Sequence, residues 1–198
     1  FLKTPADIAA SLKKIRQIGY QAVQVSGMGP IIEAELLKIL KGEGLVCAAT
    51  HENKILTDTA AMIERLDKLE CKYTAVPSPG KASLVTLAGV KDFAKKINDA
   101  GKMFFDSGKV LTYHNHSIEF QRVEGRLILE IIYGETDPRY LQGEIDTYWV
   151  QHGGGDPADW CERLKQRLPL LHMNPRRLFS SDKARFLILP SQKISSNQ

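Results

Sequence analysis

The sequence predicts an α/β fold of the (β/α)₈ TIM-barrel type, incomplete, with about six parallel strands and surrounding helices. Amphipathic helical segments alternate with short apolar segments along the chain, and helices of crossover length join strands in parallel. The competing fold is a doubly wound open sheet. Neither GxGxxG nor GxxxxGK[ST] follows a predicted strand, so the sequence gives no support to the nucleotide-binding proteins with that fold. Polar residues instead collect at successive strand ends, where a barrel carries its chemistry: His51, His114, His116, Asp146 and His172.

The first helix has a clear start and end in the sequence. Thr4 can cap it, Pro5 fits the first helical position and Asp7 completes a capping box. Gly19 ends it. The segments that follow are predicted as strand 20–27, helix 30–41, strand 45–53, helix 56–69, strand 72–77, helix 83–106, strand 109–115, helix 127–133, strand 141–150, helix 157–167 and strand 169–173.

The alternation stops near residue 174. We therefore predict a partial barrel over residues 1–174 and an atypical basic tail over residues 175–198. The tail holds five basic residues and one acidic residue, whereas residues 1–174 hold 22 of each sign and are neutral. A neutral body gives no excess of positive charge for phosphate binding, so no nucleic-acid partner is expected.

An open barrel exposes sheet edges. We expect either a homo-oligomer or the apolar run of residues 186–189 to cover one of them. No apolar stretch approaches the ~18 residues of a membrane span, and the N-terminus lacks the pattern of a signal peptide. Three cysteines without CxxC spacing are predicted to be buried thiols, and a cytoplasmic location is expected.

Glu144 and Asp146 lie two residues apart in a predicted buried strand, so alternation puts both carboxylates on one face. A buried charge is costly unless it is paired or bound to a cation. One alternative is a carboxylate held by a neighbouring helix N-terminus. His114 and His116 have the spacing to chelate an ion, although HxH alone is a weak signal.

His51 and His172 end apolar strands, where a lone histidine is more often a core residue with satisfied hydrogen bonds. Trp149 could stack on a sugar or simply pack at the barrel mouth. The residues by themselves leave these alternatives open.

Several motifs in chain order resemble the sugar phosphate isomerase/epimerase group of the xylose isomerase-like TIM barrels. The resemblance covers roughly residues 5–174 and rests on the motifs LKKIRQIGYQAVQVSG, LVCAATHEN, YHNHSIEF, GEIDTYWVQHGGGDPADW and RLPLLHM.

The resemblance implies a divalent cation, Mn²⁺, Mg²⁺, Co²⁺ or Zn²⁺, at the C-terminal mouth. By motif position, Asp146 and His172 match the aspartate and histidine ligands of that group. His114 stands where the related epimerases carry a glutamate ligand. No residue of the tail matches the last glutamate ligand, because the tail contains no glutamate. The chain therefore resembles a barrel truncated at both ends, in which the cation could be absent.

The implied activity is metal-dependent isomerisation or epimerisation of a sugar or sugar phosphate, by proton abstraction next to a carbonyl. The candidates for proton transfer are His114, Glu144 and His51, and the candidates for substrate contact are His116 and Trp149. The alternatives are a vestigial or non-catalytic sugar-binding barrel, and a keto-sugar lyase or apurinic endonuclease-like metal enzyme on the same scaffold.

Overall fold

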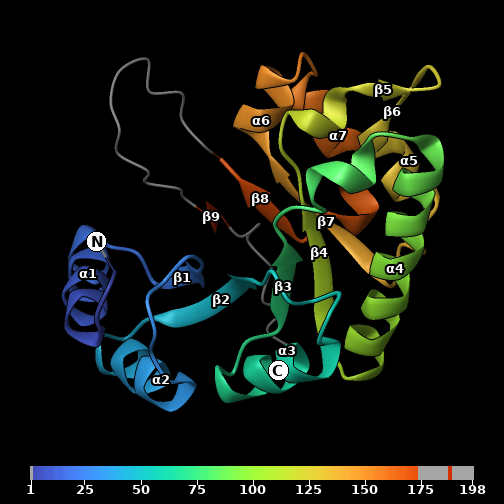
Figure 1. Ribbon diagram of the computed structural model, residues 1–198. Coiled ribbons are helices and arrows are strands. Elements are labelled where there is room, and N and C mark those ends of the chain that lie inside the picture. Colours follow the sequence, from blue (N-terminus) through green and yellow to red (C-terminus); the bar gives the residue numbers. More distant parts are fainter. Residues whose placement is uncertain (1, 174–186, 189–198) are drawn as a thin grey trace, which may run out of the picture.

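The computed structural model describes residues 2–173 and 187–188 of the chain. Six parallel strands curl into part of a barrel, in the order β1-β2-β3-β4-β7-β8 (Figure 1). The strands are β1 (Ala22–Val25), β2 (Val46–His51), β3 (Tyr73–Val76), β4 (Val110–His114), β7 (Leu141–Asp146) and β8 (Leu170–His172). The helices are α1 (Pro5–Ile18), α2 (Glu33–Gly42), α3 (Thr59–Lys68), α4 (Leu87–Asp106), α5 (Ile128–Gly134), α6 (Thr147–His152) and α7 (Pro157–Arg163).

This architecture confirms the predicted incomplete barrel and its six parallel strands. The predicted capping box is present at the start of α1. The Thr4 side chain accepts a hydrogen bond from the Asp7 amide, and the Asp7 side chain accepts one from the Thr4 amide. Gly19 ends α1 in the left-handed conformation, with φ of 112°, which glycine adopts without steric cost.

Element boundaries depart from prediction most clearly in the segment 141–150. Its strand ends at Asp146, and Trp149 lies in helix α6 instead of in the strand. The Trp149 amide donates to Asp146 Oδ1 at 3.1 Å, which caps the helix. Smaller shifts affect α2, which begins at Glu33, and α4, which begins after its cap Thr86.

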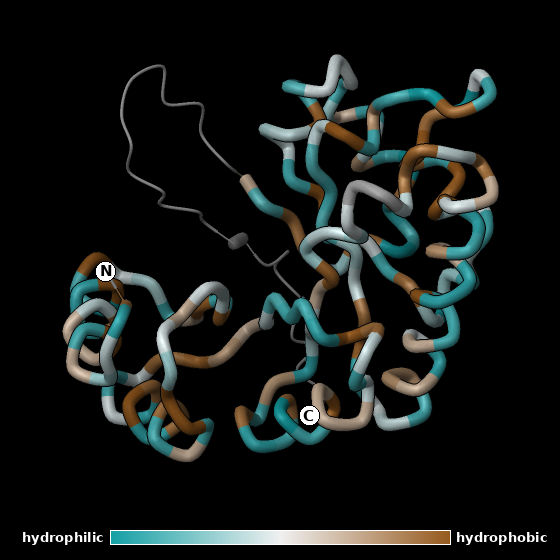
Figure 2. The backbone as a smooth tube through the Cα atoms, in the orientation of Figure 1, coloured by the Kyte–Doolittle hydropathy of each residue, from teal (hydrophilic) through white to brown (hydrophobic). Residues whose placement is uncertain are grey.

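Apolar helix faces cover the outside of the sheet. Helix α4 packs against β4, β7 and α5, and short hydrophobic and hydrophilic stretches alternate along it in Figure 2. Its buried stripe has helical spacing and includes Val90, Phe93, Ile97 and Phe104. No Cβ would fit at Gly101, because it would lie 2.2 Å from the carbonyl oxygen of Tyr140.

A small antiparallel hairpin, β5 (Arg122–Val123) and β6 (Arg126–Leu127), was not predicted. Both turn residues have positive φ, 50° at Glu124 and 81° at Gly125. That conformation is typical of a two-residue hairpin turn, which Gly125 favours.

The predicted boundary near residue 174 and most of the basic tail lie outside the described residues. Within the described part, β9 (Leu187–Ile188) pairs antiparallel with β8, in the register Leu171 with Ile188 and His172 with Leu187. The predicted covering of a sheet edge by tail residues is therefore confirmed at β8. No helix among the described residues has the length and apolar character to cross a membrane.

Candidate metal centre

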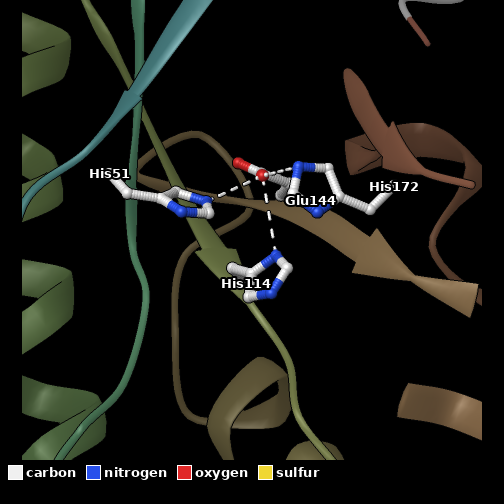
Figure 3. Close-up of side chains that lie close together, drawn as sticks. All are labelled: His51, His114, Glu144 and His172. Carbon is white, nitrogen blue, oxygen red and sulfur yellow. Dashed lines mark hydrogen bonds and ion pairs between the residues drawn. The ribbon is translucent and has the colours of Figure 1, made fainter. Parts of the chain in front are cut away.

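The site lies at the C-terminal ends of the parallel strands. His51, His114, Asp146 and His172 are the last residues of β2, β4, β7 and β8. Glu144 lies two residues earlier on β7, deeper in the barrel. Because parallel strands end at the same edge and the sheet curls, the side chains converge in its interior. Figure 3 shows four of them: His51, His114, Glu144 and His172.

Four of these residues form the histidine–glutamate cluster: His51, His114, Glu144 and His172. Each offers a ligand atom, and the four atoms lie within 4.8 Å of one another. Oε1 of Glu144 is 3.0 Å from His51 Nε2 and 2.9 Å from His172 Nε2. His114 Nδ1 is more distant, at 3.6 Å. Such a set of imidazoles and a carboxylate could hold a divalent cation.

Two further residues of the cluster's surroundings were missed at the sequence level. Gln24 on β1 donates its amide Nε2 to Glu144 at 2.8 Å, and its Oε1 lies 2.6 Å from His172 Nε2. Thr112 donates its hydroxyl to Glu144 Oε2 at 3.2 Å. The only signal for Gln24 was a polar residue inside the apolar strand AVQV.

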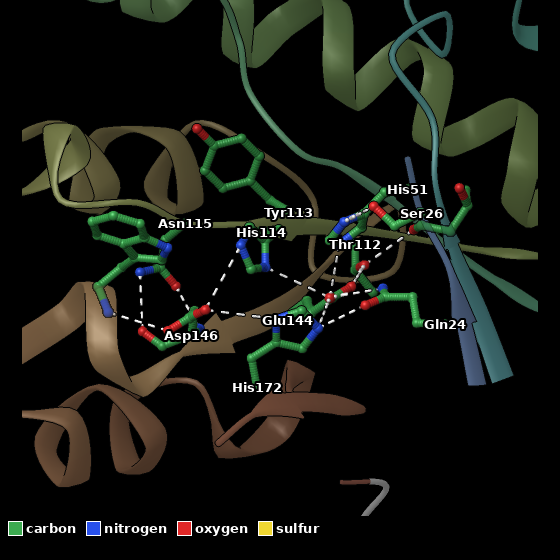
Figure 4. Close-up of polar contacts among 12 residues, drawn as sticks. Gln24, Ser26, His51, Thr112, Tyr113, His114, Asn115, Glu144, Asp146 and His172 are labelled. Carbon is green, nitrogen blue, oxygen red and sulfur yellow. Dashed lines mark hydrogen bonds and ion pairs between the residues drawn. The ribbon is translucent and has the colours of Figure 1, made fainter. Parts of the chain in front are cut away.

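Asp146 lies beside the cluster and faces it with one oxygen. Its Oδ1 caps α6, and its backbone amide donates to Asn115 Oδ1 at 2.9 Å. Its Oδ2 lies 3.6 Å from His172 Nδ1 and 3.9 Å from His114 Nε2 (Figure 4). We call these three atoms the outer set, because Asp146 is nearer the strand end than Glu144.

In this site, burial and the charges of neighbouring groups shift the pKa values in opposite directions. Burial would raise the pKa of Glu144, but contacts with His114, His172 and His51 hold it well below its usual range. Burial lowers the pKa of His114, against the pull of Glu144. Burial also acts to lower the pKa of His172, but Asp146 and Glu144 outweigh it and raise that pKa to about 9.

The outer set fits a cation on the evidence of its unpaired atoms. Asp146 Oδ2, both ring nitrogens of His114 and Nδ1 of His172 are buried without a hydrogen-bond partner. Leaving a buried polar group unpaired costs about 1–3 kcal/mol. A divalent ion beside these atoms would replace the missing partners, and imidazole nitrogen with carboxylate oxygen is a donor set that suits Zn²⁺, Mn²⁺ and Co²⁺.

His116 and Trp149 lie next to this centre and outside the histidine–glutamate cluster. The ring centroid of His116 is 4.9 Å from that of His114 and 5.3 Å from that of Trp149. The backbone amide of His116 donates to buried Glu119 at 2.8 Å, a contact that the sequence did not indicate. The cluster of possible ligands includes His114 and leaves out His116.

Comparison with known proteins places the fold. No family model matches the sequence, and no curated protein matches it. The chain is similar to the crystal structure of a sugar phosphate isomerase/epimerase from Parabacteroides distasonis ATCC 8503, with a TM-score of 0.78 and 24% identity over 90% of this chain and 76% of that chain.

Two solved structures with lower sequence identity also have a similar fold. A xylose isomerase-like TIM barrel protein from Mycobacterium smegmatis in complex with magnesium has a TM-score of 0.64 and 10% identity, over 86% of this chain and 67% of that chain. An AP endonuclease, family 2, from Brucella melitensis has a TM-score of 0.65 and 11% identity, over 81% of this chain and 71% of that chain.

Fold and site together define an incomplete TIM barrel with a candidate metal centre at its C-terminal mouth. Within that class, the fold is similar to those of solved structures described as sugar phosphate isomerase/epimerase and as xylose isomerase-like TIM barrel proteins. The predicted resemblance is thus confirmed at the level of the fold.

Proposed function

We propose that this chain is a metal-dependent isomerase or epimerase that acts on a sugar or sugar phosphate. The observation that carries the proposal is the outer set, in which Asp146 Oδ2 faces His114 and His172 nitrogens that lack hydrogen-bond partners. The likeness to sugar phosphate isomerase/epimerase structures supports the same class of reaction.

In this proposal Asp146, His114 and His172 hold the cation. Their oxygen-to-nitrogen distances of 3.6 and 3.9 Å leave room for an ion that bonds each donor at about 2.0–2.2 Å. When bound, the cation would polarise a sugar carbonyl and stabilise the negative charge that develops during proton abstraction. Two imidazoles favour Zn²⁺ over Mg²⁺, and the carboxylate also suits Mn²⁺.

His51 is the proposed acid/base group. Its Nε2 faces Glu144, which can only accept while it is ionised, so this nitrogen carries the proton. Its Nδ1 then has the free lone pair, directed at the hydroxyl of Ser26, 3.2 Å away. That nitrogen would take a proton from the carbon beside the carbonyl and return it to the former carbonyl carbon, while the hydroxyl proton of the first carbon passes to the former carbonyl oxygen, as ketose–aldose interconversion requires.

His116 and Trp149 are the proposed substrate contacts. Their rings lie side by side at the edge of the centre, and Trp149 Nε1 is buried without a hydrogen-bond partner. An indole N–H in this state can donate to a sugar hydroxyl, while the ring face packs on the apolar face of the sugar.

Proton exchange in D₂O tests the function. Protein loaded with Mn²⁺ is incubated with aldoses and ketoses, phosphorylated and free, and loss of the C–H signal beside the carbonyl is followed by ¹H NMR. We expect exchange with at least one sugar, and none with Asp146→Asn or after EDTA treatment. Manganese binding without exchange for any sugar would instead favour a non-catalytic sugar-binding barrel, and failure to bind any cation would favour a vestigial one.

The apurinic endonuclease alternative has less support. The Brucella structure shows that the fold hosts such a protein, but residues 1–174 of this chain are neutral, and binding to DNA depends on many cationic contacts with phosphates. Cleavage of an oligonucleotide with an abasic site, lost in Asp146→Asn, would overturn the preference for a sugar.

Self-association is part of the proposal. Among the described residues β1 pairs only with β2, so one edge of the sheet is open, and an open edge is a template for another strand. We propose that a second copy covers it. Light scattering at several concentrations should give a mass above 22.1 kDa, and a monomer at all of them would refute the association.

A further inference from the structure

The side chain of Glu144 faces polar groups from β1, β2, β4 and β8. It is fully buried and accepts from Gln24, Thr112 and His51. Its Oε1 also faces Nε2 of His172 and, at longer range, Nδ1 of His114. One carboxylate therefore faces a nitrogen of each histidine in the cluster.

This arrangement fixes where the ring protons lie. An ionised carboxylate only accepts hydrogen bonds, so the nitrogen that faces it must donate. The proton is then on Nε2 of His51 and of His172. Nδ1 of His114 faces the same oxygen at 3.6 Å, beyond hydrogen-bond distance, where the negative charge favours the proton on that nitrogen. The free lone pairs point away from Glu144.

Gln24 gives an independent check at His172. The Gln24 amide nitrogen must face Glu144, because only it can donate, and so its Oε1 faces His172 Nε2 at 2.6 Å. An amide oxygen only accepts, and Nε2 of His172 must therefore donate. Two acceptors, one charged and one neutral, thus place the proton of His172 on the same nitrogen.

These proton positions determine which atoms the rings of His114 and His172 present to Asp146, on the side away from Glu144. With these protons in place and the second ring proton of His172 removed, Nδ1 of His172 and Nε2 of His114 present lone pairs to Asp146 Oδ2, at 3.6 and 3.9 Å. Three acceptor atoms that face one another are repulsive unless a cation or a proton lies between them. A ligating histidine commonly donates its other N–H to a carboxylate, which orients the ring and strengthens the ligand.

We infer that Glu144 is a positioning residue: it lies beneath the mouth, holds the rings of His51, His114 and His172, and directs the free nitrogens of His114 and His172 at a cation beside Asp146. The inference deepens the proposed function and rests on it for the identity of the ligand.

The distances separate this role from direct ligation. Oε1 of Glu144 lies at hydrogen-bond distance from His51 and His172, 3.0 and 2.9 Å, and its other oxygen accepts from Thr112. Its contacts are therefore satisfied within the protein, whereas Asp146 Oδ2 is not. The carboxylate with the unpaired oxygen is the better ligand.

Glu144→Gln and Asp146→Asn are the matched variants that test the inference, since each replaces one carboxylate by the amide of the same shape. Affinity for Mn²⁺ and Zn²⁺ is measured by calorimetry, and thermal unfolding shows that each variant folds. We expect Glu144→Gln to weaken binding about 10–100-fold, the usual effect of losing such a carboxylate partner, and Asp146→Asn to weaken it much more. X-ray absorption should give the same number of nitrogen ligands in wild type and Glu144→Gln.

The ring protons supply a readout that needs no metal. In ¹⁵N NMR of the cation-free protein, Nε2 of His51 and His172 should be protonated and hydrogen-bonded, and Glu144→Gln should shift these signals. Glu144→Asp keeps the charge and should restore part of the wild-type pattern. If the wild type binds no cation the proposed function fails, and these spectra still decide the role of Glu144.

Two results would overturn the inference. Equal and complete loss of metal binding in Glu144→Gln and His172→Ala, with Asp146→Asn near wild type, would make Glu144 a direct ligand. Unchanged ring signals and unchanged affinity in Glu144→Gln would show that it positions nothing.

Discussion

Gln24 and His172 are 148 residues apart, on the first and the last of the six parallel strands, yet Gln24 Oε1 lies 2.6 Å from His172 Nε2. In a flat sheet these strands would be about 24 Å apart, since neighbouring strands are about 4.8 Å apart. The contact therefore shows that the sheet curls far enough to bring its first and last parallel strands together. It also ties the two ends of the sheet to Glu144 at the barrel centre.

Removing this link should destabilise the fold. Gln24→Ala removes one buried hydrogen-bond partner from Glu144 and one from His172, and we expect the free energy of unfolding to fall by about 1–3 kcal/mol. Urea denaturation measures it. Gln21→Ala, at an exposed side chain just before β1, is the control and should change stability by less than about 0.5 kcal/mol. Equal effects of both variants would mean that the link contributes nothing.

Affinity for Mn²⁺ should increase with pH. The pKa of His172 is raised to about 9, so below that pH the cation must displace a proton from this ring. Affinity should then rise by about tenfold per pH unit between pH 6.5 and 8.5 and level off above 9. Calorimetry at several pH values, in two buffers of different ionisation enthalpy, measures the affinity and the proton released. A constant affinity without proton release would contradict the role of His172 as a ligand.

Gly101 should be irreplaceable by alanine. A Cβ there would lie 2.2 Å from the Tyr140 carbonyl oxygen, so α4 would have to move away from the sheet. We expect Gly101→Ala to destabilise the protein by about 1–3 kcal/mol, although alanine is the better helix former. Gly42, the last residue of α2, has open space around it. Gly42→Ala should be neutral or stabilise by up to about 1 kcal/mol. Thermal unfolding compares the two variants, and a stable Gly101→Ala would contradict the close packing.

Much of the fold could be predicted because its signals are local. Alternating helices and strands, the capping box at Thr4 and the polar strand ends are all read within a few residues. The end of β7 was predicted wrongly, since apolar and aromatic residues continue through Trp149. The side chain of Asp146 stops the strand there by capping α6, and that contact has no periodic signal.

The candidate site was predictable in part for the same reason. Histidines at strand ends are visible in the sequence, and the structure brings His51, His114 and His172 together. The roles of Gln24 and Thr112 depend on the curl of the sheet, which sets contacts between strands far apart in the chain. The two carboxylates on β7 share a face, as predicted, but only their unequal hydrogen bonds distinguish them.

Substitution of His51 tests whether proton transfer and cation binding belong to different residues of the site. In the proposed function His51 moves a proton and does not hold the cation, because its Nε2 donates to Glu144 and its Nδ1 faces Ser26. His51→Asn should therefore reduce proton exchange of the sugar about 10²–10⁴-fold, while affinity for Mn²⁺ stays within a few-fold of wild type. NMR exchange in D₂O and calorimetry measure the two effects separately. His152→Asn, at an exposed residue beside Trp149, is the control and should leave metal binding unchanged. If His51→Asn instead loses the cation as completely as His172→Ala, the ion lies within the histidine–glutamate cluster, and the outer position beside Asp146 is wrong.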